Sequence, residues 1–184
     1  MEYIILFLPL IAAILSGFFH NIVGEKMCSY ITSIFVSISA ILSIAIFYNV
    51  TLTGYENNIL IAKWINSGTL TVNWSIKIDA LSSVMLVVVN LISSLVHIYS
   101  IGYMSHDPHK PRFMAYLSLF TFAMLTLVSS DNFLQLFFGW EGVGLCSYFL
   151  IGFWFKKNSA NSAAIKAFLV NRVGDFGFAL GIFL

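Results

Sequence analysis

The amino-acid sequence predicts an all-α integral membrane protein with six transmembrane helices and a small β-hairpin on the membrane surface. Of its 184 residues, 59% are apolar and only 9% are charged, whereas a soluble domain carries about a quarter charged residues. The apolar residues gather in six runs that meet or approach the roughly 20 residues a helix needs to cross a hydrocarbon core. One long connection instead alternates apolar and polar residues, the pattern of a strand.

The apolar runs set the positions of the six helices. We expect them at about residues 3–19, 28–48, 80–103, 113–129, 132–155 and 160–184. The first run is no signal peptide, because Glu2 takes the place of a basic stretch and no small-residue cleavage site follows. Pro108 and Pro111 interrupt the chain before the fourth helix, since proline does not continue a helix. Asp131 or Asn132 is placed to cap the fifth helix.

The connection between the second and third helices has structure of its own. Apolar and polar side chains alternate from residue 70 to residue 78, with the two-residue period of a half-buried strand. A second apolar stretch covers residues 59–65, and the Asn-Ser-Gly sequence at residues 66–68 is typical of a turn. We therefore predict a β-hairpin at about residues 59–78, lying on the membrane surface.

The basic residues predict the orientation and exclude one class of partner. Nine Lys and Arg against eight Asp and Glu give a net charge of +1, without the basic excess of a nucleic-acid-binding protein. The first, third and fifth connections hold five basic residues, namely Lys26, Lys110, Arg112, Lys156 and Lys157, while the hairpin segment holds Lys63 and Lys77. Because basic residues favour the inside, we expect the N-terminus and the hairpin outside.

The last residues are apolar up to Leu184, without the polar or basic flank that follows a membrane helix. No linker or internal repeat divides the chain. We therefore expect residues 1–184 to form a single membrane domain, truncated within or just at the end of the sixth helix and belonging to a larger bundle.

Four ionisable residues inside the predicted helices are candidates for proton transfer. A charged group at mid-membrane costs about 2.5–3.5 kcal/mol on insertion scales, so each one requires an explanation. Glu141 lies near the middle of the fifth helix, where it is either a proton-relay carboxylate or a permanently paired structural one. Asp175 and Arg172 are three residues apart on one face of the sixth helix, so they can pair with each other. Lys166 follows a basic connection and could extend to the interface instead.

Other polar and small residues have simpler explanations. His97 is expected to be a satisfied interface residue or, alternatively, a relay member, and Asp79 a helix cap. Cys28 and Cys146 lie in apolar runs, and the chain has no metal-ligand spacing or nucleotide-binding glycine motif, so we expect no cofactor, metal or redox centre in it. Gly139, Gly142 and Gly144 around Glu141, and the Gly177–Gly181 pair, indicate close helix packing.

The sequence around Glu141 resembles a known family closely. Residues 139–154 read GWEGVGLCSYFLIGFW, the fifth-helix signature of the antiporter-like subunit of respiratory complex I called subunit L in bacteria and chain 5 in mitochondria. Residues 163–168 and 171–177 look like the sixth helix of that family, and residues 113–132 resemble its fourth helix. The resemblance covers the whole chain.

The resemblance implies a proton-translocating subunit of a NADH:quinone oxidoreductase, in the bacterial plasma membrane or the mitochondrial inner membrane. NADH, FMN, iron–sulfur clusters and quinone would then belong to other subunits, and the partners would be other membrane subunits, especially the neighbouring antiporter-like one, together with the bilayer. In the family, the glutamate matching Glu141 works with a lysine on a seventh helix, which these residues do not include.

Two alternatives stay open from the sequence. The chain could be a truncated remnant that inserts into the membrane but conducts no protons. It could also belong to a cation/proton antiporter, because such subunits share the architecture, although their fifth helix usually departs from the sequence found here.

Overall fold

The computed structural model describes residues 1–68 and 70–183, and it confirms the predicted helical architecture with its hairpin. Leu184, the end of the sixth predicted helix, lies outside the described residues. The elements are α1 (Glu2–Phe18), α2 (His20–Val23), α3 (Glu25–Thr53), β1 (Asn57–Ser67), β2 (Leu70–Ile78), α4 (Ala80–Tyr103), α5 (Lys110–Val128), α6 (Phe133–Ile151) and α7 (Asn158–Phe183).

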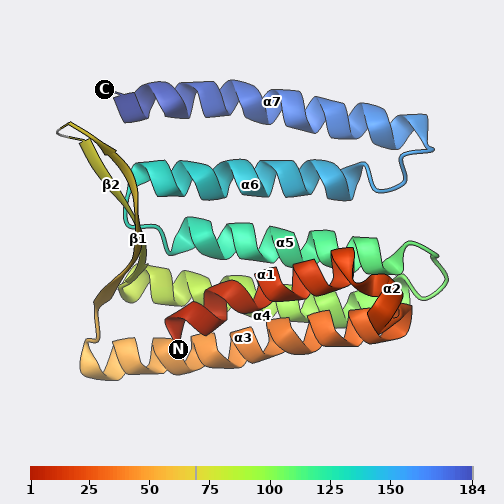
Figure 1. Ribbon diagram of the computed structural model, residues 1–184, viewed down its shortest axis with the longest axis horizontal. Helices are drawn as coiled ribbons and strands as arrows, with labels where there is room; N and C mark the ends of the chain where they lie inside the picture. The colour runs from red at the N-terminus through yellow and green to blue at the C-terminus, as the bar shows by residue number, and fades with distance from the viewer. Residues whose placement is uncertain (69, 184) are drawn as a thin grey trace.

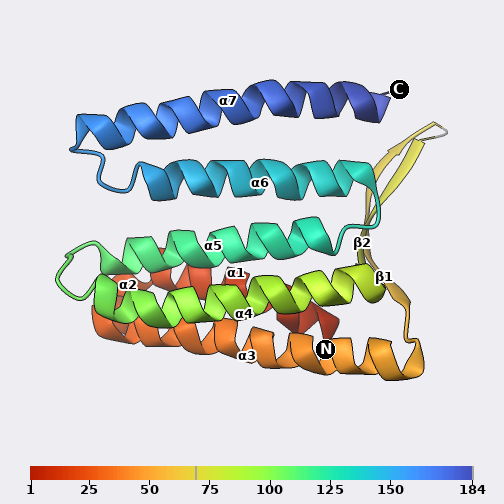
Figure 2. The ribbon, with the colours of Figure 1, turned by 180° about the vertical axis from the view of Figure 1, so that it is seen from behind.

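The long helices lie side by side and run in alternating directions (Figure 1). Seen from behind, α4, α5, α6 and α7 follow one another across the molecule (Figure 2). The hairpin crosses the end of the bundle at which α4 and α6 begin, and we call this the hairpin end. The connections from α1 to α3, from α4 to α5 and from α6 to α7 form the opposite end, which we call the basic end because it holds Lys26, Lys110, Arg112, Lys156 and Lys157.

The helix boundaries differ from the predicted ones at several places. α3 is longer than expected, since it extends from residue 25 to residue 53 between two glycines with positive φ, Gly24 (87°) and Gly54 (63°). Glycine adopts this backbone region without steric cost and therefore marks both ends of the helix. The short helix α2 was not predicted, because four residues are too few to show a periodic pattern.

Two further boundaries follow from proline and aromatic packing. α5 begins at Lys110, before the predicted start, because Pro111 lies in its first turn, where a missing N–H and a fixed φ cost nothing. α6 ends at Ile151 instead of continuing to residue 155. After Gly152 the chain turns inward, so that the Phe153 ring packs edge-to-face on Phe113 with ring centroids 5.3 Å apart.

Of the described helices, four are long and apolar enough to cross a membrane: α3, α4, α5 and α6. α1 is apolar but has only 17 residues, and α7 carries Lys166, Arg172 and Asp175 among its 26 residues. The prediction of six spans is therefore confirmed for four helices. For α1 and α7 the helix itself is confirmed, and its membrane crossing stays a prediction.

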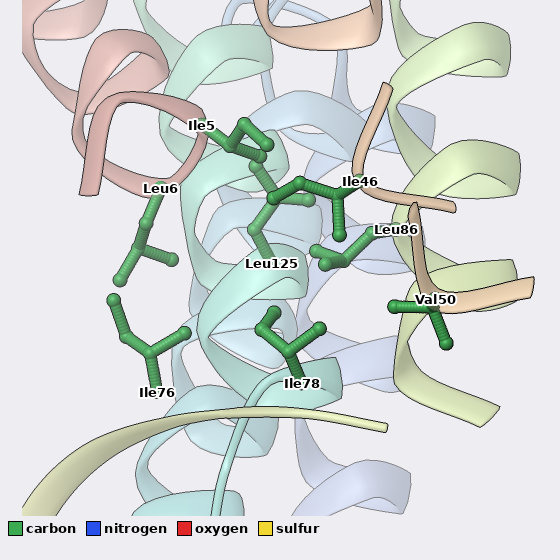
Figure 3. Packing of buried hydrophobic residues seen from close by; sticks show 8 residues of the cluster. All are labelled: Ile5, Leu6, Ile46, Val50, Ile76, Ile78, Leu86 and Leu125. Atoms are coloured by element: carbon green, nitrogen blue, oxygen red, sulfur yellow. The ribbon is translucent and has the colours of Figure 1, made fainter. Parts of the chain in front are cut away.

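The hairpin is anchored to the helices by an apolar cluster at its end of the bundle. Eight buried side chains from four helices and β2 meet there (Figure 3): Ile5, Leu6, Ile46, Val50, Ile76, Ile78, Leu86 and Leu125. β1 and β2 pair in antiparallel fashion, as predicted. Burying the β2 side chains holds the hairpin across the start of α6, the helix that carries Glu141.

Asp79 is the N-cap of α4, as the sequence predicts. Its side chain accepts a hydrogen bond from the backbone N–H of Ser82 at 2.7 Å, and the Ser82 hydroxyl accepts one from the N–H of Asp79 at 2.7 Å. This reciprocal pair is a capping box. The bond from the Ser82 N–H is the main reason why the pKa of Asp79 lies below its usual value.

Replacing this cap is expected to lower the stability of the protein by an amount that depends on pH. Asp79→Ala should lower the free energy of unfolding by about 1 kcal/mol at pH 7. Because the folded state lowers the pKa of Asp79, its charge stabilises the fold above the ordinary pKa of about 3.9 and this contribution is lost as the pH falls through the folded value. The difference between the wild type and the variant, measured by unfolding in mixed detergent micelles, should therefore shrink near pH 3. Asp131→Ala, at an exposed residue that is not the cap, should change little.

Candidate functional site

The hairpin fixes the start of α6. Asn132 is the N-cap, and its side chain accepts a hydrogen bond from the N–H of Gln135 at 2.9 Å. The buried Gln135 side chain in turn accepts from the N–H of Ser75 at 3.0 Å and donates to the Ser75 carbonyl oxygen at 2.8 Å. Because the amide satisfies both backbone groups of one β2 residue, the helix is held in one position along its axis.

Two glycines bring α6 against α5. A Cβ atom at Gly139 would lie 2.7 Å from the Leu127 backbone, and one at Gly142 would lie 3.1 Å from the Ala123 Cβ. Successive residues of an α-helix are rotated by about 100°. Glu141 is therefore turned away from the face that contacts α5, and its side chain reaches α7. It is the ninth of 19 helical residues, about 12 Å from the start of α6.

The Glu141 carboxylate contacts Arg172 of α7, which also contacts Asp175 of the same helix. An Arg172 guanidinium nitrogen donates to Glu141 Oε2. The same nitrogen, Nη1, lies 3.6 Å from Oδ2 of Asp175, which confirms the predicted pairing of these two residues within the helix. Asp175 is buried, and its other oxygen accepts a hydrogen bond from the Trp140 indole N–H at 2.8 Å. The cluster of Trp140, Glu141, Arg172 and Asp175 is hereafter the carboxylate cluster.

The charges of the carboxylate cluster do not balance. Two ionised carboxylates share one guanidinium, so the cluster carries an excess negative charge in the middle of two helices. The two carboxylates repel each other, and the single positive charge of Arg172 can balance only one of them. One carboxylate charge of the cluster is therefore left without a countercharge among the described residues. Arg172 stays protonated and contacts both carboxylates, so it holds them together.

The remaining candidates lie elsewhere. Lys166 is exposed and makes no ion pair with any residue in the described ranges. It is therefore not part of the carboxylate cluster, although its predicted role in proton transfer stays a prediction.

His97 is completely buried, and its ring is satisfied by hydrogen bonds, as expected. Its Nδ1 lies 2.7 Å from the Ser93 carbonyl oxygen, and its Nε2 lies 3.0 Å from the Ser118 hydroxyl oxygen. Since a carbonyl only accepts, Nδ1 carries the proton and Nε2 accepts from Ser118. Both ring nitrogens are satisfied in a neutral ring, which is sufficient to explain the residue as part of the packing between α4 and α5.

Sequence reasoning missed two features of the carboxylate cluster. It did not single out Trp140, and it assigned Arg172 to Asp175 without recognising the contact with Glu141. The indole next to Glu141 was the available signal, because the N–H of a tryptophan in an apolar helix needs a hydrogen-bond acceptor. The contact between α6 and α7 could not be derived, since it depends on the relative rotation of the two helices. Over residues 1–68 and 70–183, no group of three or more His, Cys, Asp or Glu side chains could hold a metal ion.

Comparisons with known proteins show the family of the chain. Residues 64–114 match the family described as NADH-ubiquinone oxidoreductase (complex I), chain 5 N-terminus, and residues 130–184 match NADH:quinone oxidoreductase/Mrp antiporter, TM. The chain is 54% identical over 178 residues to NADH-quinone oxidoreductase subunit L of Rickettsia bellii, covering 97% of this chain and 28% of the relative. It is 57% identical over 183 residues to NADH-ubiquinone oxidoreductase chain 5 of Triticum aestivum, covering 100% of this chain and 27% of the relative.

A solved structure shares the fold. The membrane-bound sulfane sulfur reductase, an archaeal respiratory membrane complex, contains a chain that matches with a TM-score of 0.83 and 18% identity, covering 98% of this chain and 36% of that one. The family match over residues 130–184 places the bundle of antiparallel helices in the class of antiporter-like membrane subunits. Within that class, the chain belongs to the subunit L/chain 5 family of the NADH:quinone oxidoreductases. It spans just over a quarter of the length of these relatives.

Proposed function

We propose that this chain works as part of a proton-translocating membrane subunit of a NADH:quinone oxidoreductase. The observation that carries the proposal is the unequal charge of the carboxylate cluster, in which Glu141 and Asp175 share Arg172. In this proposal the cluster holds a proton and releases it when a neighbouring charge changes. Electron transfer from NADH to quinone, with its FMN and iron–sulfur centres, takes place on other subunits.

The proposal includes a location and partners. The chain would lie in the bacterial plasma membrane or the mitochondrial inner membrane, next to other membrane subunits and above all a neighbouring antiporter-like one. The basic end carries five Lys and Arg, and the hairpin segment carries two. This asymmetry supports an orientation with the N-terminus and the hairpin outside. The two relatives described above are named as oxidoreductase subunits, which favours this function over that of a separate cation/proton antiporter.

The proposal is tested by Glu141→Gln in the assembled complex. The amide keeps the shape of the side chain and removes its titration, so NADH-driven proton uptake into inverted vesicles should fall about tenfold or more, since a positioned proton-transfer group contributes at least that much. Subunit assembly, followed by native gel electrophoresis, should be unchanged. Glu56→Gln makes the same chemical change at an exposed residue of the described chain and should leave pumping intact.

Normal pumping by an assembled Glu141→Gln complex would show that the carboxylate is a structural ion-pair partner only. If the wild-type chain does not assemble with the other subunits at all, the chain is a non-conducting remnant and the proposal is wrong.

A further inference from the structure

The basic end contains a partly open pocket that the carboxylate cluster does not use. It has a volume of about 460 Å³ and lies between α5, α6 and the start of α7. Aromatic rings form much of its wall, and its polar lining comes from Arg112, Tyr116, Tyr148 and Asn161. Pockets of this size and composition are typical of small-ligand sites.

Arg112 is the only charged side chain that lines this pocket among the described residues. One guanidinium nitrogen, Nη2, donates to the Phe153 carbonyl oxygen at 3.3 Å, and the Nε–H is buried without a partner in the described chain. The Phe153 and Phe155 rings flank the guanidinium at 4.9 and 5.5 Å. The rings fix the group in place but supply no anion, so most of its five donors remain available.

Asp107 is close enough to interact with Arg112 electrostatically, but the two residues form no ion pair. Asp107 accepts hydrogen bonds from the backbone N–H of His109 at 2.8 Å and from the Trp154 indole at 3.1 Å. No carboxylate in the described chain lies within ion-pair distance of Arg112. A guanidinium with unused donors matches a phosphate group, which accepts two parallel hydrogen bonds from it.

An apolar groove adjoins the same arginine. This second cavity, of about 370 Å³, lies between α1 and α5 and is lined by Leu10, Ile14 and Phe18 on one side and by Leu119 on the other. Arg112 and Tyr116 line both cavities. A basic pocket that continues into an apolar groove is complementary to an amphiphile with an anionic head and a hydrocarbon tail.

The position along the helices fits the same kind of ligand. Arg112 is the third residue of α5, and the pocket reaches about one turn further to Tyr116, a depth of about 6 Å. Aromatic residues at such a depth mark the headgroup region of a bilayer, where basic pockets between helices bind anionic lipid heads. The exposed Lys156 and Lys157 of the same end add to the positive potential.

We propose that the Arg112 pocket binds an anionic phospholipid, with the phosphate at the guanidinium and an acyl chain in the groove between α1 and α5. The lipid phosphate supplies an ion-pair partner for Arg112, which has none among the described residues. It also fills the groove between two helices that meet at the basic end.

The test is binding of phosphatidylglycerol to the delipidated chain in a nonionic detergent, followed by native mass spectrometry. Phosphatidylglycerol should bind more tightly than phosphatidylcholine. Arg112→Gln should weaken binding about tenfold, the loss expected for charge-assisted hydrogen bonds. Lys26→Gln removes one exposed charge from the same end and should change binding less than twofold. Arg112→Lys keeps the charge but not the paired donors, so its affinity for phosphatidylglycerol should lie between those of Arg112→Gln and Lys26→Gln.

A second variant separates a lipid from free phosphate. The Cβ of a residue at position 17 would meet the Ala115 Cβ at an ordinary 3.6 Å, so Gly17→Leu can enter the groove without a backbone clash. It should weaken phosphatidylglycerol binding and leave binding of inorganic phosphate unchanged. If Arg112→Gln proves unfolded by circular dichroism, Gly17→Leu and Arg112→Lys decide the matter.

Three outcomes would overturn the proposal. The first is equal binding of phosphatidylglycerol by folded Arg112→Gln and wild type, and the second is equal affinity for phosphatidylcholine. The third is Arg112-dependent binding of inorganic phosphate together with lipid binding that Gly17→Leu does not affect. None of these measurements involves proton pumping, so they are independent of the proposed function.

Discussion

Arg172→Leu is expected to destabilise the protein by about 3 kcal/mol, more than the loss of either carboxylate. Arg172 contacts both Glu141 and Asp175, and its removal leaves two carboxylates close together without a countercharge. Breaking a buried ion pair by removing one partner costs about 3–5 kcal/mol. The Arg172 side chain is 46% exposed in this chain, so the lower part of that range applies. Unfolding in mixed detergent micelles measures the effect.

Lys166→Leu is the matched control, because it removes a cation from the same helix that has no carboxylate partner among the described residues. It should leave the stability nearly unchanged. Adding Glu141→Gln to Arg172→Leu should recover part of the loss, since only one unpaired carboxylate then remains. Equal destabilisation by Arg172→Leu and Lys166→Leu would show that the ion pairs of the carboxylate cluster contribute nothing to the fold.

The sequence was sufficient to predict the six long helices and the hairpin, because each of them carries its own local pattern, whereas the four-residue helix α2 carries none. The apolar runs predicted the six long helices, and the alternation after residue 70 predicted β2. The boundaries were less predictable, since they depend on single residues. Gly24 and Gly54, both with positive φ, place the ends of α3 further apart than the apolar run predicts. α6 ends earlier than predicted, because the chain turns so that Phe153 packs on Phe113.

The site could be predicted only in part, because its residues come from two helices whose relative rotation is not written in a local pattern. Glu141, Arg172 and Asp175 could be selected one by one, because each is an ionisable residue in an apolar helix. The pair of Arg172 and Asp175 followed from their spacing of three residues. The contact between Glu141 and Arg172 spans 31 positions and depends on how α6 is rotated between α5 and α7. No local pattern contains that rotation.

Gly139 allows the closest approach of α6 to α5 among the glycines of α6, and Gly139→Ala is expected to destabilise the protein by about 1–3 kcal/mol. The new Cβ would lie 2.7 Å from both the N and the Cα of Leu127, which are backbone atoms that no change of side-chain conformation can move. α6 would therefore have to shift away from α5. In an open helix position the same substitution stabilises by about 1 kcal/mol, because alanine is the better helix former.

Gly144→Ala supplies that comparison on the same helix. Its nearest neighbour would be the Asn171 side-chain nitrogen at 3.9 Å, an ordinary contact. The two variants should therefore change the free energy of unfolding in opposite directions, although they are identical in chemistry and only five residues apart. A shift of α6 also moves Trp140, so Gly139→Ala should lengthen the hydrogen bond from its indole to Asp175 and change the tryptophan fluorescence. Equal effects of the two variants on stability would mean that the contact between α5 and α6 does not fix the position of Glu141.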